Sequence, residues 1–322
     1  MYLSAALLIA MKKIKTVCLL FLCAMIWGFS FVAQTKGADS GIGALSYNGF
    51  RFIIGTVSLI PVAFIFGKGG NKAPSENNNG SKRQLIFGGI IAGCALCCAS
   101  FTQQMGIHFG IADGTPNITG VAGFITGIYI IFIPIIRLLL GKKTTATTAL
   151  GALAAVVGLY FLCVTDGIGS IKRAHIMLLL CAVLFACHII IVDRFAPSVN
   201  AVMFSLVQFA TAAALGTALA LIFEHPTLLQ IKAAIVPLLY SGILSSGVAY
   251  TLQTIAQKDA DPTFAGIVFS TESVFSAVGG AIFLHEIMTG RGYFGCILIF
   301  GGIIISQLDL NKIKKANKKG GN

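Results

Sequence analysis

Charged residues are scarce in this chain of 322 residues. Asp, Glu, Lys and Arg together make up 11% of the sequence, against roughly a quarter in an ordinary soluble domain. Hydrophobic residues make up 56%, and the mean hydropathy is +0.89. A soluble protein of this length could not bury so much apolar surface, whereas lipid can cover it. The composition therefore excludes a soluble globular protein and predicts an all-α membrane protein.

The motifs of several enzyme and pump classes are also missing. The sequence contains no phosphate-binding loop ending in GK[ST], no GxSxG nucleophile elbow and no HExxH zinc motif. Histidines and carboxylates are scattered, and the cluster Cys94-Ala-Leu-Cys97-Cys98 lacks a second pair of ligands. We therefore expect no enzymatic activity, no metal, no cofactor and no ATP-driven pumping by this chain alone. The net charge is +12, but no basic-aromatic patch accompanies it, so we expect no nucleic-acid partner.

Long apolar runs are what the sequence does contain. A membrane-spanning helix needs about 20 predominantly apolar residues. Ten transmembrane helices are predicted on this basis, at residues 16–34, 46–67, 85–106, 115–138, 145–164, 174–193, 199–223, 233–256, 262–285 and 290–308. Pro116, Pro134 and Pro262 lie in or at the starts of spans 4 and 9, where proline is expected to kink a helix.

The basic residues are distributed unequally between the loops. If the N-terminus is cytoplasmic, 17 Lys and Arg fall on the cytoplasmic side, five fall outside, and Arg51 alone lies well inside a span. The positive-inside rule then predicts that both termini are cytoplasmic, in a multi-pass protein of the cell (plasma or inner) membrane. Residues 1–15 form the cytoplasmic N-terminus and residues 309–322 a basic cytoplasmic tail. The start is left open between Met1 and Met11. If Met11 is the start, residues 1–10 are a start-site artefact.

The sequence repeats itself weakly. Leu22–Gly28 parallels Leu180–Ala186, Arg51-Phe52 parallels Gln208-Phe209, and Phe101–Gln104 parallels Tyr250–Gln253. We therefore expect two five-helix repeats, residues 16–164 and 174–308, joined by a linker at 165–173. Because five spans is an odd number, the second repeat is inverted in the membrane, as in many secondary transporters with a substrate site between the halves.

Two charged residues lie inside predicted spans. Arg51 is near the outer end of span 2, and Glu272 is near the middle of span 9. Charges at such depths are costly and usually mark functional sites. Arg51 is a candidate contact for an anion or carboxylate, and its alternative is a snorkelling structural residue. Glu272 is a candidate for proton exchange or for binding a cation, and its alternative is a structural hydrogen bond.

Amides and aromatic residues complete the candidate substrate-binding set. Amides inside a membrane either join helices or line a cavity, and aromatic residues either form its wall or pack helices. The candidates of these two kinds are Gln104, Asn117, Gln208 and Gln253, and Trp27, Phe31, Tyr129 and Tyr250. By contrast, His188 and Asp193 near the end of span 6 are interpreted as residues of the cytoplasmic interface.

The order of several short segments resembles EamA-type members of the drug/metabolite transporter superfamily. Trp27-Gly-Phe-Ser-Phe31 and Arg51-Phe52 resemble the opening spans, and residues 123–134 (GFITGIYIIFIP) resemble the fourth. Ser270–Phe275, followed by Leu284-His-Glu286, resembles the ninth span and the turn after it. The resemblance extends from about Thr16 to Leu308.

This resemblance implies ten helices in two inverted repeats, both termini cytoplasmic, and alternating access around a central cavity. It also implies export or exchange of amino acids, related metabolites or drugs. The family pattern has a glutamate after span 4, where this chain reads Leu140-Gly-Lys142-Lys143. Glu286 is then the single remaining copy, with a structural role expected.

The function predicted from the sequence is secondary active transport that exports or exchanges a small organic metabolite. Proton coupling is one expectation for its driving force. The partners expected are a small-molecule solute and the lipid bilayer, and the protein is expected to be a monomer or a homodimer. A membrane-embedded lipid-modifying enzyme and a solute channel or facilitator are the alternatives. The enzyme would need clustered carboxylates or histidines, and the channel a continuous polar stripe through several spans.

Overall fold

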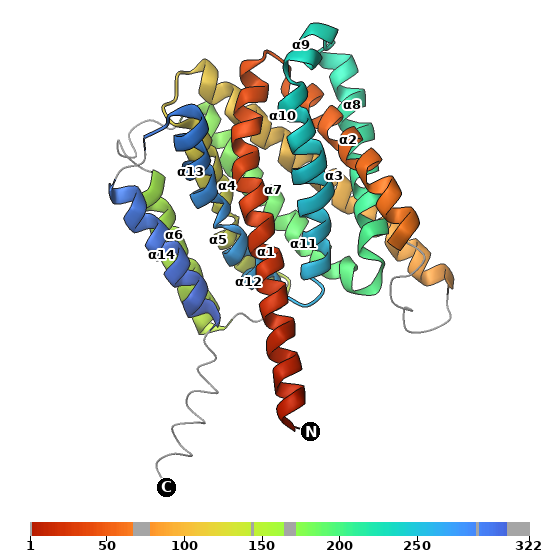
Figure 1. The fold of residues 1–322 in the computed structure, drawn as a ribbon, viewed down its shortest axis with the longest axis vertical. Helices are drawn as coiled ribbons and strands as arrows, with labels where there is room; N and C mark the ends of the chain where they lie inside the picture. Colours follow the sequence, from red (N-terminus) through yellow and green to blue (C-terminus); the bar gives the residue numbers. More distant parts are fainter. Residues whose placement is uncertain (1, 67–77, 143–144, 164–171, 288–289, 308–322) are drawn as a thin grey trace.

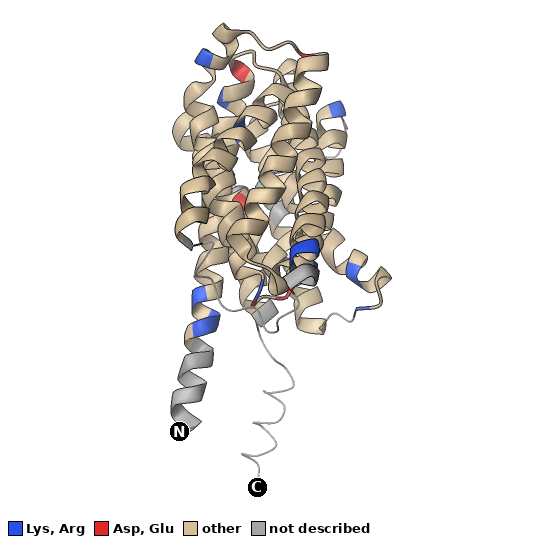
Figure 2. Cartoon of the chain, turned by 90° about the vertical axis from the view of Figure 1, so that its right-hand side faces the viewer, with Lys and Arg blue, Asp and Glu red and all other residues tan. Residues whose placement is uncertain are grey.

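The protein is described from a computed structural model that places residues 2–66, 78–142, 145–163, 172–287 and 290–307. These residues fold into helices and connecting turns without a β-strand, which confirms the all-α prediction. Figure 1 shows the helices gathered side by side into one bundle. Lys, Arg, Asp and Glu lie mainly toward its two ends, and the middle is nearly free of them (Figure 2).

The first half of the chain provides six helices. They are α1 (Tyr2–Asp39), α2 (Ala44–Phe66), α3 (Asn78–Ala112), α4 (Ile118–Gly127), α5 (Tyr129–Leu139) and α6 (Ala146–Cys163). Helix α1 begins at Tyr2 and runs without a break into the first predicted span, so residues 2–15 continue the helix of that span. Helices α4 and α5 follow one another directly and together occupy the predicted span 4.

The second half has more interruptions. It contains α7 (Arg173–Phe195), the 3-10 turn η1 (Ala196–Ser198), α8 (Ala201–Phe223), the short α9 (Leu228–Ala233), α10 (Ile235–Leu239), the π-helix η2 (Tyr240–Tyr250), α11 (Thr251–Ala256), α12 (Pro262–Phe269), α13 (Glu272–Leu284) and α14 (Gly290–Gln307). The predicted span 8 is thus built from α10, η2 and α11, and span 9 from α12 and α13.

Eight helical segments in the described part of the chain are long and apolar enough to cross a membrane. Two shorter apolar helices, Ala146–Gly158 and Tyr293–Ile305, fall in the predicted spans 5 and 10. The count of ten spans therefore remains a prediction. The helices themselves form because runs of apolar residues leave each backbone N–H and C=O to be satisfied within its own segment.

The helices pair reciprocally between the two halves. Helix α3 packs against α7 and α8, and the corresponding segment η2 packs against α1 and α2. In the same way, α13 packs on α1, while α4 and α5 pack on α7. The remaining close pairs, α2 with α8 and α6 with α14, join helices at the same place in each half. Most of the close helix pairs thus join one half of the chain to the other.

Spans 4 and 9 are interrupted at matching places. Between α4 and α5 the N–H of Ile128 bonds the carbonyl of Ile125 at 3.2 Å, three residues back rather than four. Between α12 and α13 the N–H of Thr271 bonds Val268 in the same manner at 3.1 Å. No proline causes either interruption, because Pro134 lies inside α5 and Pro262 in the first turn of α12. The residues directly after the breaks are Tyr129 and Glu272.

Helices α2 and α8 cross at a pair of glycines. A Cβ atom on Gly216 would lie 3.2 Å from the Cα of Gly49, and one on Gly49 would lie 2.8 Å from the backbone N of Thr217. The backbones are therefore too close for a side chain at this point. Such small-residue crossings allow close helix packing in membranes, where dispersion contacts and hydrogen bonds replace the hydrophobic effect.

We expect Gly49→Ala to destabilise the protein by about 1–3 kcal/mol, because the added methyl must push two backbones apart. Thermal unfolding in detergent measures this as a lower midpoint. The matched control is Gly301→Ala in α14, where an added Cβ meets nothing within 4 Å and alanine has the better helix propensity. Equal midpoints for the two variants would show that the α2–α8 crossing tolerates a side chain.

Candidate functional site

A narrow cavity lies where the two halves meet, between α1, α2, α3, α4, α5, α7, η2, α11 and α13. The space between its wall atoms amounts to about 410 Å³, but the centre of a water molecule can reach only about 30 Å³ of it. One buried water needs roughly 10–15 Å³ on that measure. The cavity therefore has room for a few waters and must widen to admit a metabolite.

Aromatic side chains form much of the wall. The Trp27 ring lies 4.7 Å from that of Tyr250 and 5.1 Å from that of Phe269, measured between ring centres. The indole N–H of Trp27 donates to the backbone carbonyl of Ser245 at 3.2 Å, so the ring is fixed in place. Phe31 and Phe185 extend this apolar lining. Such a wall suits the hydrocarbon part of a small solute.

Arg51 of α2 reaches the cavity as a buried cation. Its side chain is 2% exposed. The Nε–H group faces the Ser246 hydroxyl at 3.4 Å, and the guanidinium carbon lies 5.0 Å from the centre of the Phe52 ring. Its Nη1 atom has no hydrogen-bond partner, and no ion pair joins Arg51 to a carboxylate among the described residues. An unpaired buried charge is costly, so Arg51 remains a candidate contact for an anionic group of a solute.

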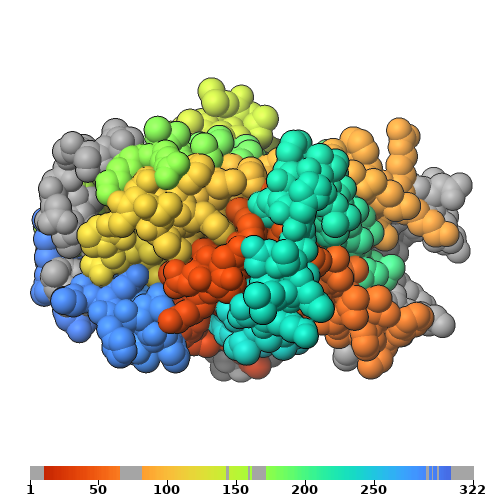
Figure 3. Space-filling model, turned by 90° about the horizontal axis from the view of Figure 1, so that it is seen from above, coloured from red at the N-terminus to blue at the C-terminus, as the bar shows by residue number. Residues whose placement is uncertain are grey.

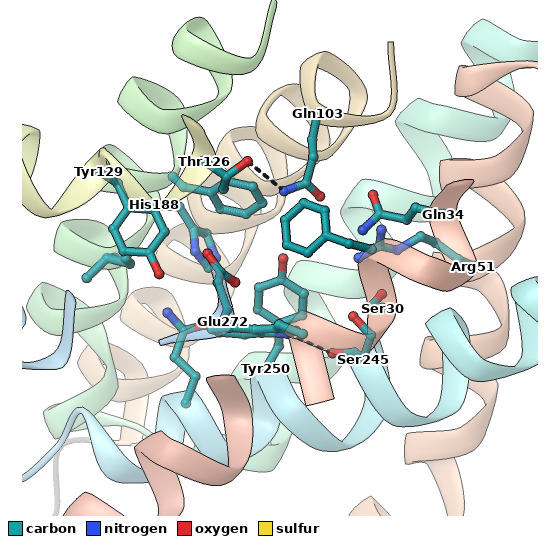
Figure 4. A pocket seen from close by; sticks show the side chains of 15 residues that line it. Ser30, Gln34, Arg51, Gln103, Thr126, Tyr129, His188, Ser245, Tyr250 and Glu272 are labelled. Carbon is teal, nitrogen blue, oxygen red and sulfur yellow. Dashed lines mark hydrogen bonds between the residues drawn. The ribbon is translucent and has the colours of Figure 1, made fainter. Parts of the chain in front are cut away.

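Glu272 provides a carboxylate in the same cavity. It is the first residue of α13 and is 4% exposed. Its Oε1 atom and the hydroxyl of Tyr129 are both buried without a hydrogen-bond partner. In Figure 4 Tyr129 and Glu272 lie toward one side of the cavity, and Gln34 and Arg51 lie toward the other. The two buried charges are thus separated along the cavity rather than paired with each other.

The structure places seven of the ten candidate residues at the cavity: Trp27, Phe31, Arg51, Tyr129, Tyr250, Gln253 and Glu272. Three lie elsewhere. The Gln104 amide donates to the backbone carbonyl of Gln34 at 3.0 Å, behind the wall. Asn117 begins α4 with a left-handed backbone (φ 51°), at the end of the bundle. Gln208 lies next to the wall and contacts His188.

His188 corrects the interpretation made from the sequence. It was expected at the membrane interface, but it is fully buried and lines the cavity. The reason is that α7 continues to Phe195, well beyond His188, so this residue is less close to the helix end than the apolar run suggested. Other polar residues that line the cavity but are not among the ten candidates are Ser30, Gln34, Gln103, Thr126 and Ser245. Ser30 and Gln34 follow Trp27 at the helical spacing of three and seven, which is the signal that was available.

Two glutamates from the second half of the chain cap the N-termini of helices in the first half, at one end of the bundle. The Glu286 carboxylate accepts hydrogen bonds from the backbone N–H groups of Thr119 and Gly120 at 3.1 and 3.2 Å, and so caps α4. Glu224 accepts from the N–H groups of Leu45 and Ser46 at 2.9 and 2.8 Å, and so caps α2. Carboxylates are favoured at helix N-termini, where N–H groups lack intrahelical partners.

An ion pair also joins the halves at this end. The guanidinium of Arg173 donates to Asp113 at 2.7 Å. Hydrogen bonds from Arg173 hold the pKa of the Asp113 carboxyl below its usual range. This pair therefore persists at neutral pH and weakens only when acid titrates that carboxyl. Figure 3, seen from above, shows atoms from early and late parts of the sequence side by side over the centre of this face.

Two ion pairs join the halves of the chain at the opposite end of the bundle. Lys12, in the N-terminal third of α1, contacts Asp259 at 2.7 Å. Arg137 of α5 donates to the Asp261 carboxylate, at 2.6 and 2.5 Å to its two oxygens, and Asp261 in turn caps α12 through the N–H of Thr263. Arg137 thus links α5 of the first half to the aspartate that caps α12 of the second.

A buried polar cavity between the two halves of a helical membrane protein is typical of membrane transporters. The chain belongs to the EamA-like transporter family, whose model matches residues 14–164 and 172–308. A curated relative from Archaeoglobus fulgidus, named an uncharacterized transporter, is 28% identical over 294 residues, covering 90% of this chain and 84% of that protein. The chain is thus a membrane transporter of the drug/metabolite type.

A solved structure has the same fold. This crystal structure, which is described only as that of a protein, superposes with a TM-score of 0.67. The alignment covers 91% of this chain and 96% of the other, at 19% sequence identity. At that identity the likeness shows the fold alone.

Proposed function

We propose that this chain is a secondary active transporter that exports or exchanges a small organic solute carrying both a carboxylate and an amino group, such as an amino acid or a related compound. The observation that carries the proposal is the presence of one buried cation and one buried carboxylate, each unpaired, in the same aromatic-walled cavity. A zwitterion supplies both missing countercharges at once. A solute with one charge would leave the other residue uncompensated in a medium where that is costly.

Alternating access is the mechanism that we propose. The cavity is too narrow for a metabolite, and hydrogen bonds and ion pairs join the halves at both ends of the bundle. The solute would enter when one set of contacts opens and leave when the other does, with the interrupted spans 4 and 9 moving at their matching breaks. Glu272 would couple the cycle to protons, because a proton and an ammonium group compete for one carboxylate and cannot occupy it together.

The remaining parts of the proposal concern placement in the membrane. Ten spans in two inverted repeats, residues 16–164 and 174–308, would put both termini in the cytoplasm of a cell with this protein in its plasma or inner membrane. The linker at 165–173 and the tail at 309–322 lie largely outside the described residues. The distribution of Lys and Arg along the sequence is the support for this orientation. Either a monomer or a homodimer fits these features.

Solute counterflow in proteoliposomes tests the proposed function. Vesicles loaded with a pool of unlabelled amino acids are expected to accumulate a labelled member of that pool transiently above its external concentration, because a carrier exchanges one solute for another. A channel or facilitator would only equilibrate the label, and a lipid-modifying enzyme would change neither vesicle content nor label. Protein-free vesicles are the control. Equilibration without overshoot for every amino acid would contradict the carrier proposal.

A further inference from the structure

The roles proposed for Arg51 and Glu272 leave His188, a third polar residue of the cavity wall, without a role. This histidine of α7 is fully buried, and its Nε2 atom lies 3.1 Å from the Oε1 atom of Gln208. Gln208 belongs to α8, is also fully buried and does not line the cavity. The second ring nitrogen of His188, Nδ1, has no hydrogen-bond partner. The proposed transport function does not by itself require either residue.

The contact with Gln208 decides which nitrogen of His188 carries the proton. An amide oxygen accepts hydrogen bonds and never donates them, so Nε2 holds the hydrogen that reaches Oε1. In a neutral imidazole the other nitrogen then carries a lone pair. Nδ1 is therefore an acceptor without a donor, next to a cavity. The reverse orientation of the Gln208 amide would make Nδ1 a donor, and the ligand series below distinguishes the two.

His188 and Glu272 belong to the same end of the cavity. The His188 ring lies edge-on to that of Tyr250, with 5.8 Å between ring centres. Tyr250 lies close to both Arg51 and Glu272, and Glu272 in turn faces Tyr129. Figure 4 shows His188, Tyr129 and Glu272 toward one side and Arg51 toward the other. The Glu272 end therefore offers two unsatisfied acceptors, the Oε1 atom of Glu272 and the Nδ1 atom of His188.

We propose that Gln208 holds His188 with Nδ1 as an acceptor, so that the Glu272 end of the cavity selects a primary ammonium group. A primary ammonium has three N–H donors and can satisfy both acceptors with one to spare for the Tyr129 hydroxyl. A trimethylated ammonium has none and leaves both acceptors unsatisfied. A hydroxyl has one and carries no charge. His188 contacts the solute in this assignment, whereas Gln208 is a positioning residue that acts through it. The assignment rests on the proposed function in taking this cavity as the solute site.

Binding can be measured without transport, because the chain has a single tryptophan and Trp27 lines the cavity. Four probes keep the same carboxylate and carbon chain: 2-aminobutanoate, its N-methyl form, its N,N,N-trimethyl form and 2-hydroxybutanoate. Each is titrated into the purified full chain in detergent while Trp27 fluorescence is followed. We expect 2-aminobutanoate to bind about tenfold or more tightly than the trimethyl form and 2-hydroxybutanoate, since hydrogen bonds to charged groups are the strong ones.

A double-mutant cycle tests the role of Gln208. Gln208→Met removes the amide at similar length and is expected to weaken binding of 2-aminobutanoate by about fivefold. His188→Asn keeps an acceptor oxygen near the position of Nδ1 but does not depend on Gln208 for its orientation. In that background Gln208→Met should change the affinity less than about twofold. Gln257→Met removes another buried amide that does not itself line the cavity but bonds the backbone of α7 at Ile189. It is the control for general loss of packing around α7 and should leave the affinity unchanged.

The outcomes separate this assignment from the transport proposal. Equal affinity for 2-aminobutanoate and its trimethyl form, a preference for 2-hydroxybutanoate, or no binding of any probe would overturn the assignment. So would the same loss from Gln208→Met in both backgrounds, because a merely structural glutamine produces it. If the ranking and the coupling are found but counterflow is absent, the carrier proposal fails and the ammonium site stands. If counterflow is found but the probes bind equally well, the carrier proposal stands and the ammonium site fails.

Discussion

Glu272→Gln is expected to abolish the response of transport to a pH gradient while solute exchange at saturating concentration continues. The amide keeps the shape of the carboxyl group, but it neither gains nor loses a proton. The competition between proton and ammonium at this position then disappears, and with it the link between the two fluxes. The measurement is uptake of labelled solute into proteoliposomes with and without an imposed pH gradient. In the variant the two rates should coincide, whereas in the natural protein the gradient should drive accumulation.

Two controls give this experiment its meaning. Asp39→Asn makes the same change of carboxylate to amide at the exposed end of α1 and should leave the gradient response intact. Counterflow by Glu272→Gln at high solute shows that the variant is folded and inserted, although its affinity for an ammonium group should be lower. If the variant still accumulates solute in response to the gradient, proton coupling runs through another group and Glu272 serves only to bind the solute.

The elements of the fold were predictable from the sequence because lipid imposes a simple rule on it. A run of about 20 apolar residues must form a helix that satisfies its own backbone, and the runs near Leu22, Phe52 and Leu180 do so. The interruptions were harder to place. Proline was the visible signal, but the breaks fall at Ile128 and at Ser270-Thr271, where no sequence feature distinguishes an i→i−3 bond from its neighbours. The 11-residue π-helix η2 is likewise set by packing against α1 and α2.

The candidate site was partly predictable for a different reason. Arg51 and Glu272 stand out because a charge inside an apolar run is rare and expensive, whatever the fold. Amides give a weaker signal, since they serve equally to join helices. Gln103 and Gln104 are neighbours in sequence, yet only Gln103 lines the cavity, and the rotation of α3 decides between them. His188 was missed because its depth was judged from the limits of a hydropathy run rather than from the helix that contains it.

The second large effect expected is a gain of thermal stability from Arg51→Met in the absence of solute, together with loss of carboxylate binding. Arg51 is buried with its Nη1 atom unsatisfied and no carboxylate partner, and the contacts that it does make, with Ser246 at 3.4 Å and with the Phe52 ring, are weak. Methionine fills similar space without a charge. Removing an uncompensated buried cation should stabilise the empty protein by on the order of 1–3 kcal/mol.

A paired arginine is the matched comparison. Arg137 is 15% exposed and ion-paired with Asp261, which caps α12. Arg137→Met should therefore lower the unfolding midpoint, because it leaves the aspartate without its partner. Opposite signs for the two substitutions, measured by thermal unfolding in the same detergent, are the expected result. A lower midpoint for Arg51→Met would mean that Arg51 stabilises the helix bundle. Its charge would then have a structural role rather than a role in binding the solute.

The solute itself connects the two halves of this prediction. A ligand that binds only the folded state raises the unfolding midpoint with its concentration, and a ligand whose carboxylate pairs with Arg51 does so by compensating the charge that destabilises the empty cavity. Adding 2-aminobutanoate should therefore raise the midpoint of the natural protein and leave that of Arg51→Met nearly unchanged. The substitution and the solute remove the same energetic defect, so their stabilising effects should not add. Additive shifts would place the carboxylate somewhere other than at Arg51.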